Sequence, residues 1–161
     1  MLTPLLAFVR WSSTLAPIVF LRDSRYGMPA VQSVHLVGIT LFLAAIIVLD
    51  LRLAGIGLTH ESLHGLERQL KPWAIGAVVL VIVSGLLIFL GTPSKYLHSN
   101  PFRFKMAGLG LAILFHFGVF RRFVTADSGS PARRGHLVVA GLSLTLWFLV
   151  GWAGRAIAFV P

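Results

Sequence analysis

Polar and titratable side chains lie inside segments of the sequence that are otherwise strongly apolar. One apolar run contains Gln32 and His35, and a later one contains Lys105 and His116. A polar group costs free energy inside a bilayer, so each of these is a candidate functional residue that needs a partner. Because the chain has no cysteine, any cofactor or metal must be held by histidine, lysine, methionine or oxygen ligands.

The spacing of these residues favours a flat cofactor. Lys105 and His116 are eleven residues apart, which is about three helical turns, so they lie on one face of a helix. Gly108 and Ala112 lie between them, and small residues permit close packing of helices or the approach of a macrocycle. Haem b is held in helix bundles by histidine from facing helices, so His35 and His116 are candidate axial ligands of its iron.

Depth in the bilayer limits how these ligands can pair. His35 lies about six residues into its apolar run and His116 about fifteen into a parallel run, a difference in depth of roughly 13 Å at ~1.5 Å per residue. Both are therefore not expected to bind one iron symmetrically. A single haem on His35 or His116, with a different second ligand such as Lys105, is one arrangement.

The other arrangement has two haem sites, one toward each side of the membrane. His35 would pair with His98, and His116 would pair with His64, His60 or His136. The simplest alternative is that the histidines hydrogen-bond helix carbonyls and bind no cofactor.

Charged and aromatic residues near the ends of the apolar runs have two interpretations each. We expect Asp50 and Arg52 to form an interfacial ion pair or to extend toward lipid headgroups, and alternatively to bind a propionate or a quinone headgroup. Arg155 either extends to the interface or neutralises a propionate. Trp147 and Trp152 are expected to be belt or packing aromatics, and alternatively to contact a cofactor.

The composition excludes a soluble domain. The chain of 161 residues is 57% hydrophobic and 12% charged, whereas soluble domains are roughly 25% charged. The net charge of +9 comes from residues between apolar runs, so membrane topology and anionic lipids explain it better than nucleic acid. These features predict an all-α integral membrane protein, since helices satisfy their own backbone hydrogen bonds in lipid.

Four apolar runs are long enough to cross a bilayer core of ~30 Å, which needs about 20 helical residues. They are approximately 28–49, 72–91, 101–120 and 136–160, and they make residues 23–161 a four-helix bundle. Each run begins near a proline at a first helical position, namely Pro29, Pro72, Pro101 and Pro131. Asn100 and Ser130 are candidate N-caps.

The remaining segments are expected at the membrane surface. Residues 1–22 contain a polar cluster in the middle and are predicted to form an interfacial amphipathic helix instead of a fifth span. The linker Leu51 to Lys71 is predicted to form a short surface helix. The distribution of Lys and Arg weakly favours cytoplasmic loops after the first and third spans, with the N-terminus outside a bacterial inner membrane.

Several of these residues together resemble a known family. His35, Asp50-Leu51-Arg52, Ser84-Gly85, Lys105 and His116 are similar to features of the HemJ-type protoporphyrinogen oxidases and the related CopD-like haem-binding membrane proteins. The resemblance spans about Met28 to His116 and implies haem binding and a porphyrin-like or quinone-like donor. It departs at Ala44-Ala45-Ile46-Ile47, where the oxidases have an aromatic and glycine-rich helix end.

A second resemblance is closer. Asp23-Ser24, Asn100-Pro101-Phe102-Arg103-Phe104-Lys105-Met106 and Phe115-His116 look like an uncharacterised bacterial four-helix membrane family, which implies a fold and no activity.

The leading hypothesis is a membrane protein with one or two haems b and a redox or electron-transfer role, which would make it a haem-dependent oxidoreductase. A homo-oligomer or a membrane redox partner is expected with it. The first rival is a copper-handling protein or transporter that uses His35, His98 and His116 with Met106 or Met28. The second is a structural subunit of a membrane complex whose histidines only pack.

Overall fold

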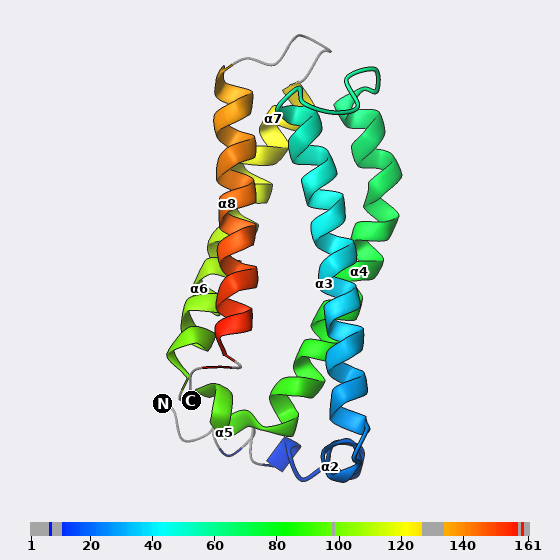
Figure 1. Ribbon diagram of the computed structural model, residues 1–161, viewed down its shortest axis with the longest axis vertical. Coiled ribbons are helices and arrows are strands. Elements are labelled where there is room, and N and C mark those ends of the chain that lie inside the picture. Colours follow the sequence, from blue (N-terminus) through cyan, green and yellow to red (C-terminus); the bar gives the residue numbers. More distant parts are fainter. Residues whose placement is uncertain (1–6, 8–10, 98, 127–133, 158, 160–161) are drawn as a thin grey trace.

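Four long helices dominate the molecule (Figure 1). The computed structural model describes all residues except 1–6, 8–10, 98, 127–133, 158 and 160–161. Within the described residues, four helices are long and apolar enough to cross a membrane: Gly27–Leu53, Leu63–Gly91, Asn100–Phe123 and Arg134–Ala156. The predicted all-α, four-helix, multi-pass membrane protein is therefore confirmed.

The spans form two antiparallel hairpins. The first hairpin pairs α3 (Gly27–Leu53) with α4 (Leu63–Gly91). The second pairs α8 (Arg134–Ala156) with α6 (Asn100–Phe115), which continues through the π-helical turn η1 (His116–Phe120) into α7 (Arg121–Ala126). Contacts between α3 and α8 join the hairpins, and Figure 1 shows the two hairpins diverging toward its lower end.

The start of α4 differs from the sequence prediction. The Ser62 side chain caps the helix by accepting a hydrogen bond of 3.0 Å from the Gly65 N–H, so α4 begins at Leu63 and not at Pro72. The separate surface helix predicted for the linker is the first part of α4, and Pro72 lies inside the helix. Proline is tolerated there because neighbouring groups in a membrane protein can satisfy the carbonyl that it leaves free.

The start of α6 agrees better with the sequence. Pro101 lies in the first turn of the helix as predicted. The N-cap is Ser99 and not Asn100, because the Ser99 Oγ accepts a hydrogen bond of 3.4 Å from the Phe102 N–H. Pro131 lies outside the described residues.

Two buried apolar clusters hold the hairpins together. The upper cluster joins all four spans and consists of Leu49, Leu53, Leu63, Leu66, Phe120, Val139 and Ala140. The middle cluster joins α3, α6 and α8 and consists of Ile46, Ala112, Trp147 and Val150. Most other large apolar side chains are exposed on the outside of the bundle, as is expected where lipid replaces water.

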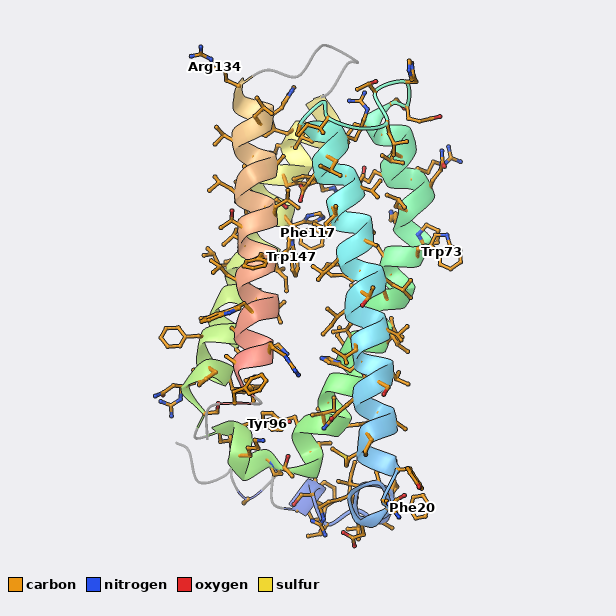
Figure 2. All side chains as sticks on the ribbon, in the orientation of Figure 1. Phe20, Trp73, Tyr96, Phe117, Arg134 and Trp147 are labelled. Carbon is orange, nitrogen blue, oxygen red and sulfur yellow. The ribbon has the colours of Figure 1, made fainter. Side chains whose placement is uncertain are left out.

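Aromatic rings close the lower end of the bundle. Phe89 of α4, Tyr96 of α5 (Pro93–Leu97) and Phe102 of α6 have centroids 5.5 to 6.1 Å apart and form an aromatic triangle. Figure 2 shows Tyr96 at this end. The two hairpins are therefore joined at this end both by the chain itself and by contacts between these aromatic rings.

A short helix, α2 (Ala16–Asp23), lies against the lower ends of α3 and α4. At eight residues it is too short to span a bilayer. Gly27 is needed where α2 turns into α3, because a Cβ there would collide with the Leu21 carbonyl oxygen. The interfacial helix predicted for residues 1–22 stays a prediction, since much of it lies outside the described residues.

The contact between α3 and α4 yields a stability prediction. A Cβ on Gly38 would lie 2.9 Å from Val81 Cγ2 and 3.4 Å from the Ala77 carbonyl oxygen. Gly38→Leu should therefore force the helices apart and cost about 1–3 kcal/mol of unfolding free energy. Thermal unfolding in detergent measures the loss, with Gly76→Leu as the matched control because a Cβ there meets nothing within 4 Å. Equal melting temperatures for the two variants would contradict this packing.

Candidate functional site

His35 is held by a hydrogen bond that assigns its tautomer. Its Nδ1 lies 2.9 Å from the Ser84 Oγ of α4. The Ser84 hydroxyl has one hydrogen, and it donates this hydrogen to the Leu80 carbonyl at 2.5 Å. Ser84 must therefore accept from His35, so Nδ1 carries the proton and, in the neutral imidazole, Nε2 keeps a free lone pair.

The orientation of the ring leaves this lone pair available. A Cβ on Gly85 would lie 3.1 Å from Cε1 and 3.6 Å from Nδ1 of His35, so this edge of the ring rests against α4 and Nε2 lies farther from it. The imidazole also interacts with the backbone of Val81, and the hydrogen bond that fixes the ring is the one between Nδ1 and Ser84. A histidine whose Nδ1–H is fixed while its Nε2 is free has the usual arrangement of a metal ligand.

Lys105 approaches His35 from the second hairpin. Its half-buried side chain crosses Gly154 of α8, where a Cβ would lie 3.5 Å from Cε and 3.6 Å from Nζ. Lys105 is close enough to His35 to act on it electrostatically. The two side chains therefore come from different hairpins and interact across the bundle.

No carboxylate neutralises Lys105 among the residues that the structure describes. The only described acidic residue at this end of the bundle is Asp23, which pairs with Arg22 at 3.1 Å. The surroundings of Lys105 therefore have an excess of positive charge, which suits a ligand that carries carboxylates.

The pair of His35 and Lys105 occupies its own layer of the bundle, here called the lower polar layer. Lys105 follows Phe102 by three residues and Ser84 precedes Phe89 by five, so the aromatic triangle lies about one turn below. Above it, Phe42 packs edge-on against Trp147, with ring centroids 4.8 Å apart. Aromatic rings thus border the lower polar layer on both sides along the bundle axis.

A second polar layer, the upper polar layer, lies between the middle and upper clusters. Asp50 of α3 and Ser143 of α8 are only 0% and 1% exposed. Both Asp50 oxygens, the Ser143 hydroxyl and His116 Nδ1 are buried and have no hydrogen-bond partner among the described residues. The predicted interfacial ion pair of Asp50 with Arg52 was wrong, because Arg52 Nε instead donates to the Glu61 carbonyl oxygen at 2.6 Å.

His116 begins the π-helical turn. The Arg121 N–H bonds back to the carbonyl of His116, five residues earlier, and the imidazole stacks on Phe120 at 5.0 Å. Single π-helical turns inside α-helices are frequently found at functional sites. The sequence placed His116 on the same face as Lys105 but contained no clear signal for this turn.

The other predicted site residues lie away from both polar layers or outside the residues that the structure describes. His98 is outside the described residues. His60 is exposed, and His64 is exposed with Nδ1 3.8 Å from Glu67 Oε2. His136 packs edge-on against Phe123, Gln32 is exposed, and Arg155 lies 4.9 Å above the Phe159 ring. The two-haem arrangement therefore gains no support from the described histidines.

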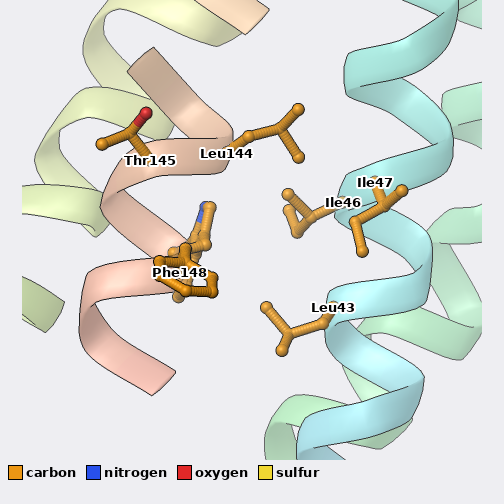
Figure 3. A pocket seen from close by; sticks show the side chains of 7 residues that line it. Leu43, Ile46, Ile47, Leu144, Thr145 and Phe148 are labelled. Atoms are coloured by element: carbon orange, nitrogen blue, oxygen red, sulfur yellow. The ribbon is translucent and has the colours of Figure 1, made fainter. Parts of the chain in front are cut away.

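A groove of about 400 Å³ between α3 and α8 has no chemistry of its own (Figure 3). Its walls are Leu43, Ile46, Ile47, Leu144, Thr145, Trp147 and Phe148. The Thr145 hydroxyl already donates to the Gly141 carbonyl at 2.7 Å. The candidate site is accordingly the lower polar layer and not this groove.

Residues 8–160 match the model of a family of unknown function, DUF6644. The chain belongs to this family. No curated protein and no solved structure matches it. Any activity of this DUF6644 protein must therefore be argued from its own polar layers.

Removing the Ser84 hydroxyl tests the assignment of the tautomer. Ser84→Ala deletes the acceptor of the Nδ1 proton, so the ¹⁵N NMR signals of the His35 ring should shift toward a mixture of tautomers. The loss of the hydrogen bond should cost about 1 kcal/mol of stability. Ser33→Ala is the control, because that hydroxyl only bonds its own helix at Pro29. Unchanged His35 signals in Ser84→Ala would refute the assignment.

Proposed function

We propose that this protein binds haem b between its two hairpins and has a redox or electron-transfer role in the membrane. In this proposal His35 Nε2 and the neutral Lys105 amine would hold the iron. The observation that carries it is the Nδ1–H of His35, which Ser84 fixes so that Nε2 keeps its lone pair, together with Lys105, which acts on His35 and has no carboxylate partner among the described residues.

The residues around the pair fit such a group. Gly85 and Gly154 let the two candidate ligands lie close against the neighbouring helices α4 and α8. The Lys105 amine must be neutral to bind iron, so the positive charge that favours the propionates of a haem is that of Arg155 at the end of α8. Aromatic rings above and below provide apolar contacts.

When bound, haem b supplies a one-electron couple, and the chain contributes ligation, orientation and a low dielectric. Ser84 orients His35 and makes its imidazole a stronger ligand. We propose a quinone-like or porphyrin-like donor and a role as a haem-dependent oxidoreductase of the bacterial inner membrane. The N-terminus would lie outside, which puts the lower polar layer on the outer side.

One visible spectrum tests the proposal. Protein purified in detergent after expression with ample haem should show a Soret band, and His35→Ala and Lys105→Ala should each lose or shift it. His60→Ala and Lys95→Ala, at exposed positions, are the matched controls and should leave it unchanged. His116→Ala should also retain the band, since His116 lies in the upper layer. Ser84→Ala should weaken binding roughly 10–100-fold.

A wild-type protein without a Soret band would overturn the proposal, as would a band that is unchanged in both His35→Ala and Lys105→Ala. Metal analysis of the same sample separates the alternatives. Stoichiometric copper without a haem spectrum would favour the metal-handling hypothesis, and neither haem nor copper would favour a structural subunit.

A further inference from the structure

The upper polar layer is built by three helices at one level. On α3, Asp50 lies one turn beyond Ile46 of the middle cluster and one turn before Leu53 of the upper cluster. Ser143 lies in the same way on α8, between Ala140 and Trp147. The same spacing on α6 and η1 places His116 between Ala112 and Phe120. The carboxyl, hydroxyl and imidazole thus share a layer that apolar residues close above and below.

The buried polar groups of this layer need a ligand that would satisfy their hydrogen bonds and charge. An ionised carboxylate buried without a partner is strongly destabilising, and an unpaired hydroxyl or imidazole nitrogen costs free energy too. The Ser143 side chain acts on the Asp50 carboxyl as a hydrogen-bonding neighbour, but the contact falls short of hydrogen-bond geometry, and the four buried atoms have no other partner among the described residues. The layer therefore needs a positive charge and hydrogen bonds that the described chain does not provide.

The donor set selects a small guest. One carboxyl, one hydroxyl and one imidazole fall short of the six to eight oxygen ligands of Ca²⁺ or the near-octahedral set of Mg²⁺. A proton needs only one oxygen, and Ser143 and His116 can then hydrogen-bond the acid. Carboxyl and histidine side chains in series are the usual components of proton relays in membrane proteins.

Several titratable side chains lie between this layer and the upper surface. Glu67 of α4 is close enough to His116 to act on it electrostatically, and its side chain is 32% exposed. His64, one turn earlier, is 74% exposed and lies 3.8 Å from Glu67. Exposure is thus high at His64, intermediate at Glu67 and His116, and zero at Asp50.

Other charged groups at this level flank these side chains. Arg121 of α7 acts electrostatically on His116, and His136 of α8 packs against Phe123. On α3, Arg52 is engaged by the Glu61 carbonyl. Toward the lower end the path is closed, because the middle cluster and the edge-on pair of Phe42 and Trp147 are apolar.

We propose that Asp50, Ser143 and His116 form an intramembrane proton-binding site that exchanges protons with the upper side of the membrane through Glu67 and His64. Asp50 is the group that takes up and releases the proton, and no electron transfer accompanies this step. The site does not depend on haem, so it stands or falls separately from the function proposed above.

Infrared spectroscopy of the full-length protein in lipid nanodiscs tests the site. A carboxylic-acid carbonyl band should appear reversibly as the pH is lowered, and Asp50→Asn should remove it. Asp23→Asn, at an exposed carboxyl, is the control and should leave it. Ser143→Ala should shift the band without removing it, which keeps the test valid if Asp50→Asn fails to fold. Absence of the band, or a band unaffected by both Asp50→Asn and Ser143→Ala, would overturn the site.

Two further measurements separate the proton from other guests and test the path. At constant pH, replacing choline chloride by sodium chloride should not change the band, and its loss would assign the site to a metal cation instead. After transfer to D₂O, Glu67→Gln should slow the isotope shift of the band several-fold. Glu61→Gln, an exposed carboxyl at the same end, should exchange at the wild-type rate. Equal rates in both variants would refute the relay.

Discussion

Lipid offers no hydrogen bonds, so every polar side chain in a span must find its partner inside the bundle. The protein meets this constraint by stacking polar and apolar layers along the bundle axis. From the lower end these are the aromatic triangle, the lower polar layer, the middle cluster, the upper polar layer and the upper cluster. The apolar layers separate the polar ones, so each polar layer interacts with its own surroundings.

The two polar layers have opposite electrostatic needs. His35 and Asp50 are fifteen residues apart on α3, which places them about 22 Å apart along the helix. Near His35 the Lys105 amine has no carboxylate partner among the described residues, which favours an anionic or metal-containing ligand. Around Asp50 the unpaired groups are a carboxyl and its hydrogen-bonding neighbours, which favour a small cation. One long helix thus carries two sites of different chemistry at different depths.

The sequence predicted the fold because its strongest signals are local. Apolar runs of sufficient length predict the spans, and Pro101 correctly predicted the start of α6. Pro72 was misleading because the Ser62 cap and nine residues of continuous helix precede it, and helix in lipid tolerates proline. The π-helical turn at His116 changes the hydrogen-bond register without a distinctive residue, so it could not be predicted.

The site was only partly predictable because partners lie on distant segments. His35 and Lys105 stand out as polar residues in apolar runs, but the role of Ser84 as the acceptor of the His35 proton depends on the pairing of α3 with α4. Asp50 was misplaced for the same reason. Beside Arg52 it has the sequence signature of a surface ion pair, whereas the helix turns it toward α8 and Ser143.

The size of each proposed guest follows from how the hairpins meet. At the upper polar layer, all four spans converge through the upper cluster, with Leu63 and Leu66 of α4 packed against Phe120 and the residues of α8. Close packing of this kind leaves place for a guest no larger than a proton or small ion. Toward the lower end the hairpins diverge, and a short helix with one aromatic ring connects them (Figure 1). The planar group proposed above would lie at the lower polar layer, where glycines flank the candidate ligands.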